Sequence, residues 1–261
     1  MKCRDIASVM ERLAPRTLAY DWDNVGLLSG DMEQEVDTVM LTLDLEMSVV
    51  EEAKKCGAQM ILAHHPIMFD PVKRITEQTP DGRLLRALIK NDISFYAAHT
   101  NLDIAKGGLN DLLASKVGLT DVRILELTNN EGAGIGRIGN LEKPVTLTEL
   151  ASKLKKALNL DFLRYSGDDD GIVSKVAVNT GGGTSLIDAA KKEGADVFIT
   201  GDYTYSQVRA AVEDGMKIID AGHYDTEIIV CELFSDYLSD KFGDALTIHE
   251  SRTNVNVLKF M

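Results

Sequence analysis

Four of the five histidines in the sequence stand beside other groups that can bind a metal ion or transfer a proton. His64 and His65 are adjacent and directly follow a short apolar segment. Further along the chain, His99 and His223 each stand four residues before a carboxylate. Imidazole and carboxylate side chains are together suitable ligands for divalent transition metals. These residue types therefore predict metal chemistry, provided that the fold brings them together.

The predicted ligands are three histidines and two carboxylates: His64, His65, Asp103, His223 and Glu227. This set suits two divalent ions about 3.5–4 Å apart, because a carboxylate can bridge two ions. Mixed nitrogen and oxygen ligands are compatible with Zn, Fe, Mn, Co or Ni. We assign His99 a catalytic role as proton carrier; a further ligand and a group that orients a ligand are its alternatives. The fifth histidine, His249, lies in a polar tail.

Structural roles are the alternative for each predicted ligand. A histidine pair after a buried strand can simply cap that strand by bonding to the backbone. Asp103 and Glu227 can likewise cap the starts of helices. The adjacent pair and the repeated spacing favour metal binding.

An internal repeat indicates how the chain positions these residues. The segment AKKCGA at 53–58 returns as AKKEGA at 190–195. A strand pattern precedes and follows each copy, and a helix and a third strand come next, ending in His-x-x-x-Asp or His-x-x-x-Glu. The predicted strands are 36–43, 60–63 and 93–98 in the first copy and 173–178, 197–200 and 216–220 in the second. Chance similarity between two α/β units is the alternative, but the repeated motif favours duplication.

Strands that alternate with helices predict a largely parallel sheet covered by helices, with chemistry at the carboxyl ends of the strands. We therefore expect an α/β fold of two similar interlinked lobes that arose by internal duplication. The predicted lobes are 1–126 and 127–261, with terminal segments that can cross between them. The dinuclear metal site is expected between the lobes.

Composition and net charge indicate which kinds of binding partner and cellular setting the chain is suited to. The net charge of −13 argues against a nucleic-acid partner, because phosphate contacts need a basic face. No stretch approaches the ~20 apolar residues that span a bilayer. Three widely separated cysteines argue against a disulfide framework and against a thiolate zinc site. We expect a soluble cytoplasmic protein with a small-molecule substrate.

Several further residues have two possible roles each. The turn around Gly181–Gly183 can cradle an anion with its N–H groups or simply join a strand to a helix; its counterpart near Asp44 is acidic. Asp202 aligns with His65 in the repeat and can face the site. Arg137, between glycines, can approach a ligand or pack in a bent strand, and Trp22 can stack on a ring or anchor a loop.

Six segments resemble the NGG-one-interacting-factor-three-like family, whose members are often labelled GTP cyclohydrolase I type 2 homologs: 22–31 (WDNVGLLSGD), 61–69 (ILAHHPIMF), 98–103 (AHTNLD), 134–139 (GIGRIG), 200–202 (TGD) and 221–227 (AGHYDTE). The resemblance implies a two-lobed α/β fold, a dinuclear metal centre on the five predicted ligands, and a homo-oligomer that is often a ring-shaped hexamer. Many members carry a further histidine soon after the TGD-like segment, where this chain has Ser206.

The function that we expect is a metal-dependent hydrolase acting on a nucleotide or phosphoester; likeness to GTP cyclohydrolase I type 2 is implied by resemblance only. The alternative is a non-catalytic metal-binding or regulatory scaffold, which would use the same ligands without turnover. A redox metalloenzyme ranks third, because helical bundles usually supply such sites.

Overall fold

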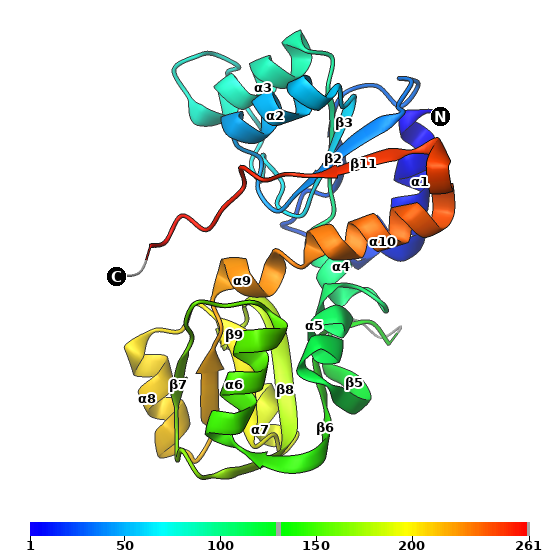
Figure 1. The fold of residues 1–261 in the computed structure, drawn as a ribbon. Helices are drawn as coiled ribbons and strands as arrows, with labels where there is room; N and C mark the ends of the chain where they lie inside the picture. The colour runs from blue at the N-terminus through cyan, green and yellow to red at the C-terminus, as the bar shows by residue number, and fades with distance from the viewer. Residues whose placement is uncertain (129–131, 260–261) are drawn as a thin grey trace. The chain divides into compact units, whose positions relative to one another are not determined.

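The computed structural model describes residues 1–128 and 132–259, which form two compact units. Unit 1 is Met1–Leu102 together with Val230–Met261, and unit 2 is Asp103–Ile229. Figure 1 shows the elements of both units. The chain thus leaves unit 1, builds all of unit 2, and returns.

Unit 1 is built on a five-stranded sheet with the order β1-β4-β3-β2-β11. Strands β2, β3, β4 and β11 are parallel, and β1 pairs with β4 in the antiparallel direction. The strands are β1 (Gly26–Ser29), β2 (Thr38–Thr42), β3 (Met60–Ala63), β4 (Ser94–Ala97) and β11 (Thr247–Glu250). The longer helices are α1 (Cys3–Leu13), α2 (Met47–Cys56), α3 (Pro80–Lys90) and α10 (Val230–Phe242), and α4 (Thr100–Ile104) follows β4.

The core of unit 1 explains why these strands are apolar. Every residue of β2, β3 and β4 is buried, as expected for parallel strands that are covered by helices on both faces. Helices α2 and α3 pack on one face, where Val50 and Leu88 meet Ile61 and Phe95 of the strands. Helices α1 and α10 lie on the other side of the sheet (Figure 1).

Unit 2 is built on a six-stranded sheet with the order β5-β6-β8-β9-β10-β7. Strands β8, β9 and β10 are parallel, and the other three pair in the antiparallel direction. The strands are β5 (Leu119–Leu127), β6 (Gly134–Thr146), β7 (Arg164–Ser166), β8 (Ile172–Gly182), β9 (Val197–Gly201) and β10 (Lys217–Asp220). The helices are α5 (Leu109–Val117), α6 (Leu147–Ala157), α7 (Ile187–Lys192), α8 (Tyr205–Glu213) and α9 (His223–Glu227).

Four strands of each sheet share one topology, which confirms the predicted fold of two similar α/β units. The order β1-β4-β3-β2 in unit 1 matches β7-β10-β9-β8 in unit 2, with an antiparallel edge strand in both. A helix precedes the edge strand in each case, α1 in one unit and α6 in the other. The repeat is therefore longer than the sequence pattern indicated, since it includes an extra helix and strand at its start.

Unit 2 begins at Asp103 and ends at Ile229, and the chain on both sides of it belongs to unit 1. Strand β5 hydrogen-bonds to β6, so it lies in unit 2 with the strands that follow it. Strand β11 pairs with β2, so the C-terminal segment lies in unit 1. The expectation that His249 lies in a polar tail was wrong, because this residue lies in β11 and pairs with Met40 of β2. Among the described residues, none of the helices is long and apolar enough to cross a membrane.

The helices have the caps that the sequence indicates. Gly57 ends α2 in the left-handed conformation with φ of 73°, and Gly194 has φ of 72° just after α7. Thr146 and Glu149 form the predicted capping box at the start of α6. Gly57 and Gly194 thus end helices directly before β3 and β9, whose carboxyl ends carry His64 and Asp202.

Candidate metal centre

Three predicted histidines come together in unit 1, at the carboxyl ends of two neighbouring parallel strands. His64 and His65 directly follow β3, and His99 lies two residues after β4. Their ring centroids are 5.2–5.4 Å apart. One ring nitrogen of each lies within 4.8 Å of the others, close enough to surround an ion. Because the two strands are neighbours in the sheet, histidines that are separated in the sequence form a cluster of imidazoles.

His64 is fully buried, and its orientation is set by the backbone of the next strand. Its Nδ1 lies 2.7 Å from the carbonyl oxygen of Ala98. A carbonyl oxygen can only accept, so Nδ1 carries a proton, and Nε2 is the ring atom that would bind an ion. A metal-binding histidine usually donates its other N–H to an oxygen in this way.

His65 is held in the same manner, but by a side chain. Its Nδ1 lies 2.7 Å from Oδ1 of Asp44, which follows β2 in the adjacent position of the sheet. The sequence drew attention to Asp44 only as an acidic counterpart of the glycine turn. The sequence did not predict its contact with His65, because a single aspartate after a strand belongs to no recognisable motif.

His99 is paired with Asp23, whose side chain is fully buried. Nδ1 of His99 lies 3.0 Å from Oδ1 of Asp23, and the other carboxylate oxygen accepts from the N–H of Thr100 at 3.0 Å and from its hydroxyl. Burial raises the pKa of Asp23, but the hydrogen bonds from His99 and Thr100 outweigh it and lower this pKa to about 2. Asp23 is therefore a carboxylate that fixes the imidazole of His99.

Unit 2 brings His223 and Glu227 together on one turn of helix. Helix α9 begins at His223, and its Nε2 lies 3.0 Å from Oε2 of Glu227, so the predicted effect of the four-residue spacing is confirmed here. On the other side of the ring, Nδ1 lies 2.6 Å from Oδ2 of Asp202. Bonding to Glu227, aided by Asp202 and opposed by burial, raises the pKa of His223 to about 9.

The glycine turn after β8 makes room for this pair. A Cβ on Gly181 would lie 2.0 Å from Oε1 of Glu227 and 3.1 Å from Nε2 of His223. The N–H of Gly181 donates to the hydroxyl of Thr226, and that of Gly183 donates to Thr200, both at 2.9 Å. These N–H groups are used within the protein, so the turn acts as close packing beneath α9 and does not form an anion cradle with them.

Asp103 belongs to unit 2 and is buried at the end of α4. Its Oδ1 accepts from the hydroxyl of Thr180 at 3.2 Å, and its carbonyl accepts from the side-chain amide of Asn110 at 3.1 Å. Asn110 in turn accepts from the N–H of Thr180 at 3.1 Å. The carboxylate is thus tied to the residue directly before Gly181, on the strand end that also supports Glu227.

Arg137 is buried and serves the structure of unit 2. Its guanidinium forms two bonds with the carboxylate of Asp111, at 2.6 and 3.0 Å. It also donates to the carbonyls of Ala105, Gly134 and Gly136 at 2.9–3.0 Å. These bonds fix the segment that directly follows α4 and Asp103. Of the two roles considered from the sequence, the structure supports packing in a bent strand.

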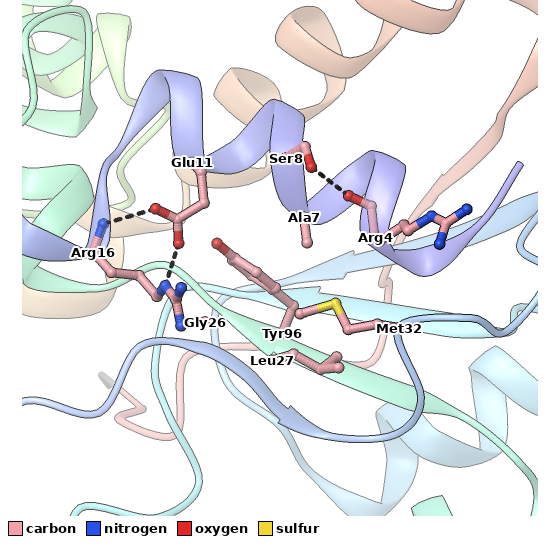
Figure 2. A pocket seen from close by; sticks show the side chains of 9 residues that line it. All are labelled: Arg4, Ala7, Ser8, Glu11, Arg16, Gly26, Leu27, Met32 and Tyr96. Atoms are coloured by element: carbon pink, nitrogen blue, oxygen red, sulfur yellow. Dashed lines mark hydrogen bonds and ion pairs between the residues drawn. The ribbon is translucent and has the colours of Figure 1, made fainter.

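Two cavities in unit 1 differ in their relation to the histidines. One, of about 410 Å³, is lined by His65 together with Asp44, Phe69 and Asp81. The other, of about 310 Å³, lies between α1 and strands β1 and β4 (Figure 2). Its Arg16 is ion-paired with Glu11, and no predicted metal ligand is among its described lining residues. Only the first cavity adjoins the candidate site.

The donor set fits divalent transition metals. Each histidine proposed as a ligand has Nδ1 against an oxygen, so Nε2 is the ring atom that would bind an ion, and Gly181 makes space for Glu227. In His223 this atom contacts Oε2 of Glu227 at 3.0 Å, and a bound ion would replace that contact. His64 and His65 lie in unit 1, whereas Asp103, His223 and Glu227 lie in unit 2. Each unit by itself therefore presents buried or half-buried imidazole or carboxylate groups at strand ends.

Sequence comparison now identifies the family. Residues 1–256 match the Duf34/NIF3 (NGG1p interacting factor 3) family. The chain belongs to this family. A Clostridium perfringens relative within it, named "GTP cyclohydrolase 1 type 2 homolog", is 42% identical over 262 residues that cover 100% of both chains.

Solved structures of similar proteins confirm the NIF3 fold. A Bacillus cereus protein related to NIF3 has a TM-score of 0.90 at 28% identity, and the match covers 100% of this chain and 99% of that one. A Staphylococcus aureus hypothetical protein has a TM-score of 0.92 at 27% identity, with the same coverage. The resemblance inferred from the HHP, HTNLD and GHYDTE segments is thus confirmed for family and fold.

Proposed function

We propose that this NIF3-family chain is a metal-dependent hydrolase that acts on a nucleotide or phosphoester. Five side chains are proposed to hold two divalent ions: His64, His65, Asp103, His223 and Glu227. The observation that carries this proposal is shared by the three histidines, whose Nδ1 atoms lie 2.6–2.7 Å from oxygen acceptors. That arrangement favours metal ligation through Nε2.

Divalent ions would supply positive charge that polarises the bond under attack and promotes the ionisation of water. The side chains of the protein would position the reacting groups and transfer protons. His99 is proposed as the proton carrier, since Asp23 holds its Nδ1 and leaves Nε2 to exchange a proton with water or substrate. Its ring lies 5.2–5.4 Å from those of His64 and His65, so such a proton would move beside the proposed ligands.

The name of the Clostridium perfringens relative supports a nucleotide substrate by similarity alone. Assembly is proposed on the same basis: we expect a homo-oligomer, and the family resemblance favours a hexamer. A substrate screen tests the proposed nucleotide substrate. Light scattering tests the proposed oligomer.

The test is metal analysis followed by turnover. Purified protein is loaded in turn with Zn, Fe, Mn, Co and Ni, its metal content is measured, and each form is screened against nucleotides and phosphoesters. We expect about two ions per chain and turnover with at least one metal. His65→Ala should lose both metal and turnover, whereas His249→Ala, which changes a histidine in β11, should lose neither.

Two outcomes would contradict the proposal. A wild-type protein that takes up no transition metal would remove its basis. Full loading with two ions but no turnover on any substrate would reject the hydrolase and support a non-catalytic metal-binding or regulatory scaffold.

A further inference from the structure

Two large aromatic rings are exposed beside the histidine cluster of unit 1. Trp22 is 59% exposed and Phe69 is 51% exposed. Their ring centroids are 6.1 Å apart, and each lies about 6 Å from that of His99, at 6.0 and 5.9 Å. Exposed apolar groups that gather at one place usually mark a binding surface.

The exposure of Trp22 is not the result of a loosely held loop. Asp23, next in the chain, is buried and bonded to His99 and Thr100. Asn24 donates to the carbonyl of Met68 at 2.6 Å, which ties this loop to the segment that carries Phe69. The ring of Tyr20 stacks on that of Trp22, with 5.9 Å between the centroids and an angle of 18° between the planes. Well-anchored neighbours thus hold the indole at the surface.

The adjoining cavity of about 410 Å³ specifies what kind of molecule could lie there. Phe69 and His65 line it, together with three carboxylates, those of Asp44, Asp70 and Asp81. None of the described residues that line it is a lysine or an arginine. Carboxylates accept hydrogen bonds and repel anions, so the cavity suits N–H donors and disfavours phosphate.

We propose that Trp22 and Phe69 form a stacking surface for a planar amino-heterocycle whose N–H groups donate to the carboxylates of this cavity. The phosphate of any nucleotide substrate then lies outside the cavity. This inference rests on the proposed function, because it assigns the part of the substrate that is recognised beside His65 and His99. Aromatic side chains stack on heterocycles with little dependence on the ring's identity, and the acceptors supply the selection.

The chain's single tryptophan makes the surface directly measurable. Fluorescence of Trp22, excited at a wavelength that the ligands barely absorb, is followed while guanosine, inosine or ribose 5-phosphate is added to the full chain. The titrations use metal-free and zinc-loaded protein. We expect saturable quenching by guanosine, weaker binding of inosine, which lacks the amino group, and no response to ribose 5-phosphate.

Variants test whether guanosine binding depends on the stacking surface or on general changes in the protein. Phe69→Ala should weaken guanosine binding roughly 5- to 150-fold, the range expected for loss of one stacking partner. Phe69→Tyr should restore it, and Asp81→Asn should weaken guanosine binding more than inosine binding. Tyr205→Ala removes another exposed aromatic residue, 81% exposed on α8, and should change nothing. Circular dichroism confirms that each variant is folded.

The outcomes distinguish this inference from the proposed function. Guanosine binding to metal-free protein supports the stacking surface even if no turnover is found with any metal. Absence of quenching by all heterocycles in both metal-free and zinc-loaded protein would overturn it. Binding of ribose 5-phosphate as tight as that of guanosine would also overturn it, because the cavity would then be recognising the phosphate.

Discussion

The carboxylate of Asp202 lies against the imidazole of His223, with 2.6 Å between Oδ2 and Nδ1. Asp44 holds the same relation to His65 in the other unit. In both pairs the aspartate follows one strand and the histidine follows the strand beside it. Asp202 adopts φ of 61°, a backbone conformation that few residues tolerate and that aspartate and asparagine accept best.

Loss of the Asp202 carboxylate should weaken metal binding without abolishing it. Asp202→Asn keeps the unusual backbone conformation but removes the charge that orients His223. We expect metal affinity to fall about 10- to 100-fold, as is usual for groups that hold a ligand in place. Competition with a chelator measures it. Asp188→Asn, which alters a carboxylate that is 96% exposed on α7, is the control, and equal affinity in both variants would contradict the assigned role.

Gly181→Ala should disturb the candidate metal site, because the new side chain would collide with Glu227. The added Cβ would lie 2.0 Å from Oε1 of Glu227, at a position with φ of 59°. Backbone strain alone costs about 1–2 kcal/mol of unfolding free energy, and displacement of Glu227 should lower metal affinity as well.

The matched control for this change is Gly215→Ala. Gly215 has φ of 83° with no atom within 4 Å of the added Cβ, so it carries the strain without the collision. Urea unfolding of metal-free protein and metal titration should show similar destabilisation for both variants but weaker metal binding only for Gly181→Ala. Weakened binding in both would show that strain alone affects the site.

Arg137→Met should destabilise unit 2 strongly. The change removes the guanidinium donor from the carboxylate of Asp111 and from the carbonyls of Ala105, Gly134 and Gly136, and Asp111 keeps the N–H of Gly107. Removal of one partner from a buried ionic network typically costs about 3–5 kcal/mol. The exposed Arg123, paired with Glu193, is the comparison, and Arg123→Met should cost less than about 1 kcal/mol. Chemical unfolding measures both, and similar losses would refute a buried structural role for Arg137.

The pKa of Asp23 predicts a specific dependence of stability on pH. Because the folded state lowers this pKa from 3.8 to about 2, the charged carboxylate stabilises the protein above pH 4. That stabilisation is lost as the pH falls from about 4 to 2, and the shift corresponds to about 2 kcal/mol. Asp23→Asn should therefore be less stable than the wild type at pH 7, with a difference that narrows below pH 4. Urea unfolding at a series of pH values tests this, and a difference that stays constant would contradict it.

Much of the α/β core was predictable because its determinants are local. The apolar segment at β3 has the predicted bounds, and β9 differs from its prediction by one residue. Gly57 and the Thr146–Glu149 box each act through contacts within a few residues, which a sequence displays directly.

The edge strands were not predictable in the same way. Strands β7 and β11 are three and four residues long and only partly buried, so they carry no apolar run. Their strand conformation depends on pairing with β10 and β2. Such pairing partners follow from the assembled sheet and not from neighbouring residues.

The same distinction applies to the site. Histidines are few, so their clustering near strand ends was visible in the sequence, and the spacing of His223 and Glu227 predicted their contact. The partners Asp23 and Asp44 were not assigned, because one aspartate among many in an acidic chain has no pattern of its own. Only the adjacency of strands shows which imidazole each one meets.

The pairing of β11 with β2 has a consequence for synthesis on the ribosome. Unit 2 is one continuous segment, so it can fold as soon as it emerges, whereas unit 1 waits for α10 and β11, which are synthesised after unit 2. Until then the outer edge of β2, an apolar strand, stays open to other chains, as unpaired edges do. Nascent and truncated forms should therefore depend on chaperones far more than the finished protein does.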